Sequence, residues 1–243
     1  SIFCFMVVMP SERWLVKIHI QEQMLTGCDA YAVYSNASAD TYFGSPAEVP
    51  ANFGGRGAMY GSKPGAWYDV VGHMAAGNLN NTGVFAQVWR HMARLRHFEA
   101  HDWVVKVDPD TAFSPARLRA LLLHRNYTGP TILGNCHQDC DFACGPIEVV
   151  TRDAMQSFCE QMGACAMQGP EDGFINSCLL DHTRTAMRPE PLLISWRLDV
   201  EPSEQWMVAK HGKIGPGHFK NRVGSIMGAG AGLAPDFAAP PAS

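Results

Sequence analysis

The stretch HDWVVKVDPDTAFSP, residues 101–115, combines a strand signal, two carboxylates and a helix start. Its first part, Trp103 to Val107, is apolar except for one lysine and rich in β-forming residues, which predicts a buried strand. The acidic sequence Asp-Pro-Asp follows at positions 108–110. Ser114 and Pro115 then supply an N-cap and a first-turn proline, so we expect a helix to begin there. Ligands of open α/β sheets bind beyond the carboxyl ends of the strands, where these two carboxylates stand.

A β-α-β order precedes this stretch. Residues 2–8 and 30–34 are short apolar runs that predict strands, and between them apolar residues recur at helical spacing from Trp14 to Leu25, with Gly27 as C-cap. This order predicts parallel strands joined by a right-handed crossover. Further helices are expected at about residues 84–98, 115–124, 152–162 and 171–180, and further strands at 131–133, 147–150 and 192–198.

We therefore expect an α/β fold with a mixed, mainly parallel central sheet flanked by helices, in a single domain over residues 1–222. Residues 35–81 are punctuated by Gly, Pro, Asn and Ser, which predicts a long irregular segment that is functional or carries small elements of its own. Residues 223–243 are Gly-, Ala- and Pro-rich and almost uncharged, which predicts a flexible tail.

Composition excludes several classes of protein. Of the 243 residues, 47% are hydrophobic and 17% are charged, which is typical of a globular chain rather than a disordered one. The formal net charge is −4, so no basic surplus indicates a nucleic-acid partner. The longest apolar run, Ile2 to Met9, is far shorter than the roughly 20 residues that span a bilayer. A membrane anchor is therefore expected only outside this chain.

The cysteine content indicates an oxidising compartment. Eight cysteines accompany three N-glycosylation sequons, at Asn36, Asn80 and Asn126, and this combination favours the secretory pathway over the reducing cytosol. Cys4 lies in one predicted strand and Cys28 just before its neighbour, so these two could pair across the sheet edge. The connectivity of the other six cysteines stays open.

A zinc site is the alternative for one group of these cysteines. The group consists of Cys136, His137, Cys140 and Cys144. Its spacing, C-x3-C-x3-C, fits no common zinc finger. We therefore favour disulfides for the cysteines of this group.

The carboxylates of Asp108 and Asp110 carry the chemistry of the predicted site. Residues i and i+2 of an extended chain share a face, so both carboxylates can point toward one ligand. Carboxylate oxygens suit Mg²⁺ or Mn²⁺, which bridge protein carboxylates to substrate phosphates. Lys106 lies two residues earlier and could pair with a carboxylate or a phosphate. The alternative interpretation is a pair of solvated turn carboxylates.

Four segments resemble those of the GT-A glycosyltransferases. DWVVKVDPDTAF, residues 102–113, resembles the metal-binding segment of the branch that contains Fringe and core-1 galactosyltransferase, and the chain looks most like its small algal and protist peptidyl-glycosyltransferase relatives. CGPIEVVTRDAMQSF (144–158), GPEDGFINSCLL (169–180) and GPGHFKN (215–221) resemble later segments of that family, in the same order. Proline replaces the central acid of the family's triplet, and Gly145 stands where the family has two glycines.

The resemblance implies a GT-A, Rossmann-like fold and a divalent cation, Mn²⁺ or Mg²⁺, held by Asp108, Asp110 and His218. It implies that Asp172 is the base that takes the proton of the acceptor hydroxyl, with Glu171 as the alternative. The simpler interpretation of these last two acids is that they offset the dipole of a helix. The residues implied in binding the donor nucleotide-sugar are Asp108, Lys106, Lys220, Arg13, Tyr34 and Ser35.

We expect a metal-dependent, inverting glycosyltransferase that moves a sugar from a UDP-sugar to a hydroxyl group of a protein or glycan in the lumen of the Golgi or ER. One alternative is a module of the same fold that binds a nucleotide-sugar or glycan without turnover, although the complete set of acids with His218 argues against it. Another is a nucleotidyltransferase. Such enzymes more often have a glycine-rich phosphate loop near the first strand, and MPSERW, residues 9–14, contains no glycine.

Overall fold

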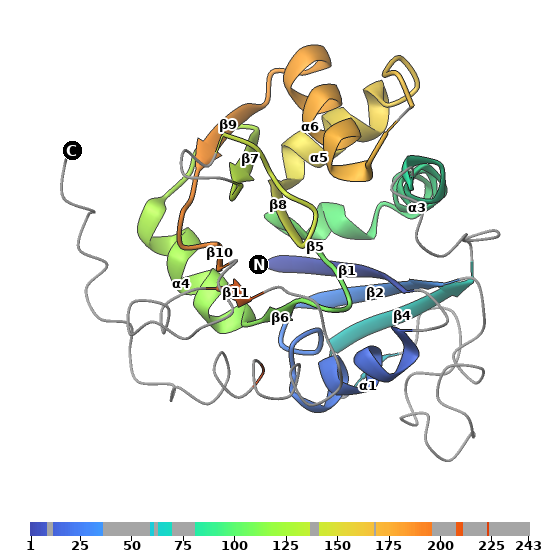
Figure 1. The fold of residues 1–243 in the computed structure, drawn as a ribbon, viewed down its shortest axis with the longest axis vertical. Coiled ribbons are helices and arrows are strands. Elements are labelled where there is room, and N and C mark those ends of the chain that lie inside the picture. The colour runs from blue at the N-terminus through green and yellow to red at the C-terminus, as the bar shows by residue number, and fades with distance from the viewer. Residues whose placement is uncertain are drawn as a thin grey trace.

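An eight-stranded sheet forms the centre of the molecule (Figure 1). The computed structural model describes residues 1–8, 12–35, 59–60, 63–69, 81–136, 141–167, 169–195, 208–210 and 223. The strands lie in the order β3-β4-β2-β1-β5-β8-β7-β9. Their bounds are β1 (Ile2–Val8), β2 (Ala30–Ser35), β3 (Met59–Tyr60), β4 (Lys63–Asp69), β5 (Trp103–Val107), β7 (Thr131–Gly134), β8 (Ile147–Thr151) and β9 (Ala186–Pro189).

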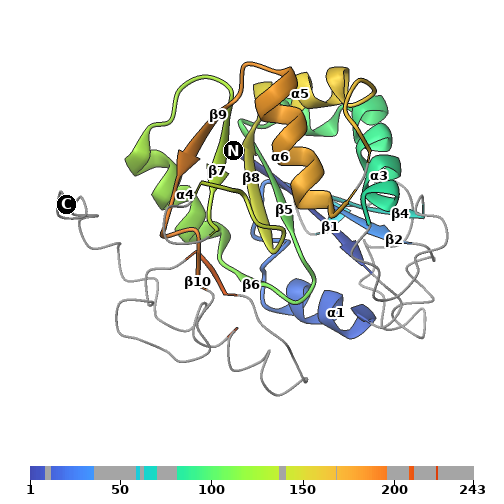
Figure 2. The same ribbon diagram turned by 45° about the horizontal axis from the view of Figure 1, so that its top comes forward.

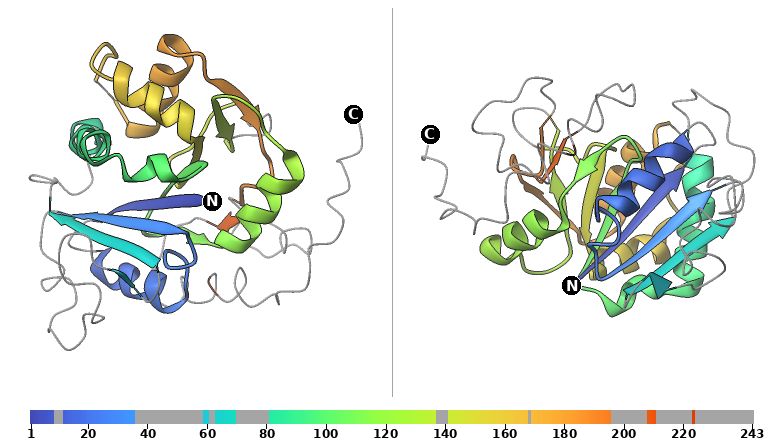
Figure 3. Two further views of the ribbon diagram at one scale, coloured as in Figure 1. Left: turned by 180° about the vertical axis from the view of Figure 1, so that it is seen from behind. Right: turned by 90° about the horizontal axis from the view of Figure 1, so that it is seen from below.

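Helices cover both faces of this sheet, and Figure 3 shows the two layers from behind and from below. The helices are α1 (Arg13–Gln21), α3 (Thr82–Leu95), α4 (Pro115–Arg125), α5 (Arg152–Gln161) and α6 (Glu171–His182), with a short 3-10 helix, η2 (His97–Ala100). A second, three-stranded sheet has the order β10-β11-β6, formed by β10 (Ile194–Ser195), β11 (Ala209–Lys210) and β6 (Ala112–Phe113). The α/β class and the single domain are therefore as expected.

The sheet is mixed rather than mainly parallel, which corrects the expectation. Strands β4, β2, β1 and β5 are parallel neighbours, but β8 runs antiparallel to both β5 and β7. The reason lies in the connection between β7 and β8. Cys136 and Cys144 are joined by a disulfide with their Cα atoms 5.4 Å apart, so this connection doubles back on itself. A parallel return would need a crossover of a dozen or more residues, usually with a helix.

The two faces of β1 explain why its whole sequence is apolar. Cys4, Met6 and Val8 pack in the core beneath α1 and α4. Phe3 and Phe5 pack in the core beneath α3, α5 and α6. A strand covered on both faces must be apolar at every position, whereas a strand with one wet face alternates. The continuous apolar run therefore identified the central strand of the sheet.

Several boundaries differ from those expected from sequence. Helix α1 ends at Gln21, not near Gly27, because Gln23 takes a positive φ of 56° that breaks the helix. Gly27 is instead needed for close packing: an added Cβ would lie 2.4 Å from the carbonyl oxygen of Gln23 and 2.9 Å from Cγ of Pro115. Of the strand expected at 192–198, the described part contains the two-residue β10, and residues 196–198 lie outside the described residues.

Segment 35–81 carries secondary structure of its own, which is one of the two alternatives expected for it, although the sequence did not locate the strand. Strand β4 lies in it and pairs in parallel with β2, from Tyr31↔Gly65 to Ser35↔Asp69. Its sequence, KPGAWYD, contains Pro and Gly, which weaken a strand prediction. Pairing with the buried strand β2 overrides this weak local preference.

Three disulfides are present among the described residues, and they are typical of an oxidising, secreted or lumenal environment. Cys4–Cys28 is the expected pair, and Cys136–Cys144 and Cys165–Cys178 are the other two. The first pairing confirms the prediction across the sheet edge, and the second confirms disulfide over zinc for the two cysteines it joins. His137 and Cys140 lie outside the described residues. Within the described ranges, no helix is both long enough and apolar enough to span a bilayer.

The predicted tail lies almost entirely outside the described residues. Val223 is the exception, and its side chain is 4% exposed and belongs to the core beneath α1 and α4. The boundary between domain and tail at residue 222 stays a prediction.

Candidate functional site

The site lies at the carboxyl edge of the parallel strands. Strands β2 and β4 lie on one side of β1, and β5 lies on the other, so the strand order reverses at β1. Ligands of such sheets bind outside the carboxyl ends at this reversal. Asp108 follows β5 directly, which places the acidic turn at this position. Figure 2 shows that the first turn of α6 lies near the point where β5 turns toward β6.

A buried lysine ties the acidic turn to α6. Lys106 is 3% exposed, and its Nζ lies 2.8 Å from Oδ1 of Asp108 and 3.1 Å from Oε2 of Glu171. The same ammonium donates a hydrogen bond to the carbonyl oxygen of Gly145, and it lies 5.1 Å from the ring centre of Phe85. Burial lowers the pKa of Lys106, but the nearby carboxylates outweigh burial and raise it well above its usual value. The lysine is therefore charged.

Two buried glutamates complete this cluster. Glu148 is 1% exposed and lies directly opposite Lys106 in the β5–β8 register, while Glu171 is 2% exposed at the start of α6. Burial raises the pKa of Glu148 well above its usual value, and repulsion from Glu171 raises it further. Burial also raises the pKa of Glu171, to about 7, although the charge of Lys106 opposes the shift.

Three carboxyl oxygens of these glutamates, both of Glu148 and Oε1 of Glu171, have no hydrogen-bond partner in the part of the chain that the structure describes. The two carboxyl groups are buried beside the same cation, Lys106, and they repel each other when both are charged. Burial and this repulsion both favour the neutral form of Glu148.

The acidic turn is held by main-chain and side-chain contacts. The amide of Asp108 donates to the carbonyl oxygen of Pro146 at 2.9 Å, and the amide of Thr111 donates to that of Asp108 at 3.0 Å. Nε2 of His19, from α1, lies 2.8 Å from the carbonyl oxygen of Pro109. Burial lowers the pKa of His19 to about 4, so the ring is neutral and carries its proton on Nε2. Asp110 is partly exposed.

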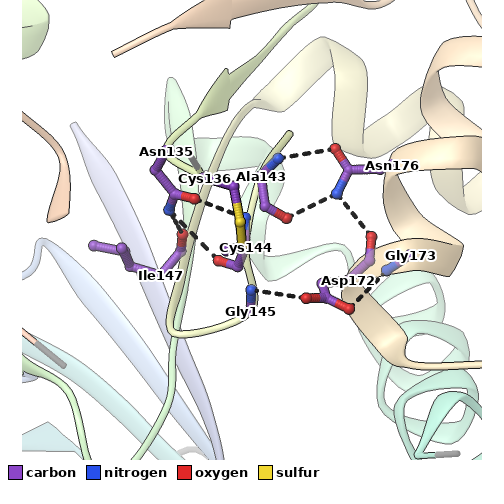
Figure 4. Close-up of a disulfide and its surroundings, with 9 residues drawn as sticks. All are labelled: Asn135, Cys136, Ala143, Cys144, Gly145, Ile147, Asp172, Gly173 and Asn176. Atoms are coloured by element: carbon purple, nitrogen blue, oxygen red, sulfur yellow. Dashed lines mark hydrogen bonds between the residues drawn. A yellow bond between two sulfur atoms is a disulfide. The ribbon is translucent and has the colours of Figure 1, made fainter. Parts of the chain in front are cut away.

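The loop before β8 lies next to the first turns of α6 in the site (Figure 4). Oδ1 of Asn135 accepts a hydrogen bond from the amide of Cys144, and its Nδ2 donates to the carbonyl oxygen of Ile147. Asn176, from α6, pairs with both main-chain groups of Ala143. Together with the Cys136–Cys144 disulfide, these contacts fix the loop between the sheet and α6.

Asp172 joins this loop to the first turn of α6. Its Oδ2 accepts a hydrogen bond from the amide of Gly145 at 3.2 Å, and its Oδ1 accepts one from the amide of Gly173 at 2.8 Å. The side chain is partly exposed, whereas the neighbouring Glu171 is 2% exposed and faces Lys106. Asp172 is therefore accessible from solvent, whereas Glu171 is not.

The remaining predicted residues divide into two groups. Tyr34 and Ser35 lie at the carboxyl end of β2, where Tyr34 is 1% exposed and Ser35 is fully buried. Arg13 begins α1, and its side chain lies outside the described residues, as do His218 and Lys220. Donor contacts by these residues stay predictions. Across the part of the chain that the structure describes, no group of three or more His, Cys, Asp or Glu side chains is arranged to hold a metal.

His19 and Glu148 belong to the site but were not predicted. Each is a polar residue inside an apolar run, LVKIHI for His19 and PIEVV for Glu148. A polar residue on a face that must be buried is the signal that could have found them, since burial without a partner is costly. The sequence could not say what their partners would be.

Comparison with known proteins identifies no family for this chain. No protein-family model matches the chain, and a search of curated proteins found no match.

Proposed function

We propose that this chain is a metal-dependent glycosyltransferase of the GT-A class, which transfers a sugar from a UDP-sugar to a hydroxyl group of a protein or glycan. The compartment we propose is the lumen of the Golgi or ER, and the three disulfides support it. Within this class, the chain would belong with the branch that contains Fringe and core-1 galactosyltransferase. The reaction we propose is inverting.

One observation carries this proposal: Lys106 contacts both Asp108 and Glu171, which are 63 positions apart in the sequence. The acidic turn and the first turn of α6 carry the two activities that sugar transfer needs, which are binding of a nucleotide diphosphate and removal of a proton. A buried lysine that joins them makes one site of two segments. Buried charges arranged at some energetic cost are typical of functional sites.

The residues of the acidic turn fit a divalent cation. One oxygen of Asp108, Oδ1, is occupied by Lys106, which leaves Oδ2 for a metal or for a ribose hydroxyl. Asp110 is partly exposed at the rim and is our first choice of ligand. Two carboxylates are enough for Mn²⁺ or Mg²⁺ when substrate phosphates and water complete the shell. His218 remains the proposed third protein ligand. When bound, the cation would neutralise the charge that builds on the departing diphosphate.

Asp172 is the residue we propose for proton removal. The amide of Gly145 and the amide of Gly173 each donate to one of its oxygens, so the carboxylate is held in one orientation. In an inverting transfer it would accept the proton of the acceptor hydroxyl as that oxygen attacks the anomeric carbon and the bond to the diphosphate breaks. Lys220 would bind the diphosphate as a point charge.

The test of the proposed function is UDP release from a panel of UDP-sugars with Mn²⁺ and a mixture of peptide and glycan acceptors. UDP released only when metal is present supports the transferase. Binding of a UDP-sugar without release would instead support the non-catalytic module, and pyrophosphate exchange would support a nucleotidyltransferase.

Two variants separate the proposed roles. Asp110→Ala should abolish Mn²⁺-dependent UDP binding, measured by calorimetry, while Asp153→Ala, an exposed acid on α5, should leave it unchanged. Retained affinity in Asp110→Ala would remove it from the metal site. Asp172→Asn should bind UDP normally and lose about 10²- to 10⁴-fold in transfer rate, since that is what general-base catalysis contributes. A transfer rate near that of the wild type would remove the base.

A further inference from the structure

His19 is a fully buried histidine on α1 that the proposed reaction does not use. Its neighbours along the helix, Val16, Ile18 and Ile20, are buried apolar residues of the core. Burying a polar ring costs free energy unless it is hydrogen-bonded. His19 forms a hydrogen bond with Pro109, 90 positions away, and its Nε2 lies 2.8 Å from the carbonyl oxygen.

The carbonyl group that His19 binds lies between the two acids. It belongs to the peptide unit that links Pro109 to Asp110, so fixing its direction also fixes the main chain from which the Asp110 side chain projects. Pro109 has no N–H group, and its carbonyl is therefore its sole main-chain hydrogen-bonding group. The bond from His19 acts on the only polar main-chain atom that this central residue offers.

The turn is thereby held from both faces of the sheet. Lys106 binds Asp108 on the face covered by α3 and α6. His19 binds Pro109 on the face covered by α1. Neighbours of metal ligands that fix orientation in this way commonly change metal affinity when they are replaced.

We propose that His19 is a positioning residue, which orients Asp110 toward the cation and the donor diphosphate by donating a hydrogen bond from Nε2 to the carbonyl oxygen of Pro109. This inference rests on the proposed function for its consequence in metal binding. The orientation of the turn itself can be measured without any ligand.

Four variants test the hydrogen bond rather than the shape of the core. In His19→Gln the side-chain amide reaches about as far as Nε2, so the donor is kept. In His19→Asn the amide reaches only as far as Nδ1, so the donor falls short, and in His19→Phe it is lost. His101→Phe is the matched control. His101 is a partly buried histidine whose ring packs on Phe3 at the amino-terminal edge of the sheet, away from the turn.

The first measurement is the Mn²⁺ concentration that gives half-maximal UDP binding. We expect His19→Phe and His19→Asn to raise it by about tenfold or more, the range found for residues that orient metal ligands. His19→Gln and His101→Phe should stay close to the wild-type value. Equal affinities in all five proteins, or the same increase in His101→Phe, would overturn the inference.

The second measurement is hydrogen exchange of the Thr111 amide, which donates to the carbonyl oxygen of Asp108 and so reports whether the turn is closed. Exchange should be faster in His19→Phe and normal in His19→Gln. If the wild type shows no Mn²⁺-dependent UDP binding but exchange follows this pattern, the proposed function fails and the His19 inference stands. Wild-type exchange in His19→Phe would overturn the inference. If His19→Phe does not fold, His19→Asn and His19→Gln, which differ by one methylene, decide in the same way.

Discussion

Two ion-pair clusters lie at opposite edges of the same sheet, and they differ in exposure. At the amino-terminal edge, Arg119 pairs with Asp29 at 3.0 Å, and their side chains are 33% and 37% exposed. At the carboxyl edge, Lys106 pairs with Glu171 at a similar 3.1 Å, but the two are 3% and 2% exposed. The two ion pairs therefore have similar N···O distances but differ greatly in their exposure to solvent.

The amino-edge cluster has a structural explanation. Oδ2 of Asp29 accepts a hydrogen bond from the amide of Ile2, so it satisfies the first main-chain donor of β1. Burial raises the pKa of Asp29, but the Ile2 amide and Arg119 outweigh burial and lower it. Exposed pairs of this kind contribute between about 0 and 1 kcal/mol. Nothing at this edge requires a functional role.

The carboxyl-edge cluster has no comparable structural explanation. One lysine faces Asp108, Glu171 and Glu148, so removal of these charges from water is only partly compensated. Replacing a buried ion pair with well-packed apolar residues is often neutral or stabilising, so stability does not explain why such a cluster persists. The contrast between the edges therefore supports the proposal that the functional site lies at the carboxyl edge.

The largest expected effect is that of Lys106→Met. The substitution leaves buried carboxyl groups without their cation, and breaking a buried pair in this way costs about 3 to 5 kcal/mol. Arg119→Met is the matched control and should cost below about 1 kcal/mol. Urea unfolding of both variants at neutral pH measures the difference. If the two variants lose equal stability, the clusters do not differ in kind.

An intermediate effect is expected on the pH dependence of stability. Glu171 has a pKa of about 7 in the folded protein against 4.5 in a free chain, so the folded state holds a proton that the unfolded state has released. The free energy of unfolding must therefore fall as pH rises through this interval. His19, with a pKa of about 4 against 6.5, acts in the opposite sense below pH 6.5. The fall in the free energy of unfolding should therefore become visible above pH 6.5.

Glu148→Gln sharpens this test. It removes one of the two glutamates whose pKa is raised, together with its repulsion of Glu171, so the fall in stability above pH 6.5 should become shallower. Asp29→Asn should leave that part of the profile unchanged, because the pKa of Asp29 is lowered below 3.8. Thermal unfolding in buffers from about pH 6 to 8 measures both slopes. An unaltered slope in Glu148→Gln would contradict the raised pKa of Glu148.

The smallest expected effect concerns salt. Screening shortens the Debye length to about 3 Å at 1 M salt, so exposed pairs weaken and buried pairs are affected little. Arg119→Ala should lower the free energy of unfolding slightly at low salt and not at all at high salt. Lys106→Met should lower it by the same amount at both salt concentrations. Chemical unfolding in urea with and without added NaCl separates them. A salt-dependent cost of Lys106→Met would mean that water reaches this cluster.

Much of the fold could be predicted because the signals are local. Strand β5 has the expected bounds, Ser114 caps α4 by accepting from the amide of Arg117, and Thr151 caps α5 by accepting from that of Ala154. Hydrophobic runs, caps and prolines act within a few residues, so one sequence contains them. Strand β4 and the antiparallel direction of β8 could not be predicted, because both depend on pairing between distant segments.

The candidate site divides in the same way. The acidic turn could be recognised from an apolar strand that runs into two carboxylates. The partners of its residues could not, because Lys106, Glu148 and Glu171 come from three elements that meet only after folding. His19 reaches Pro109 from a fourth element.

The sequence by itself determined which segments become strands and helices and where two carboxylates would stand, because hydrophobic period and capping are properties of neighbouring residues. Folding alone brought one lysine close to several acids, buried two glutamates beside it and placed a histidine against the acidic turn. These outcomes follow from burial and from distances between remote residues, and both are set by packing rather than by chain order.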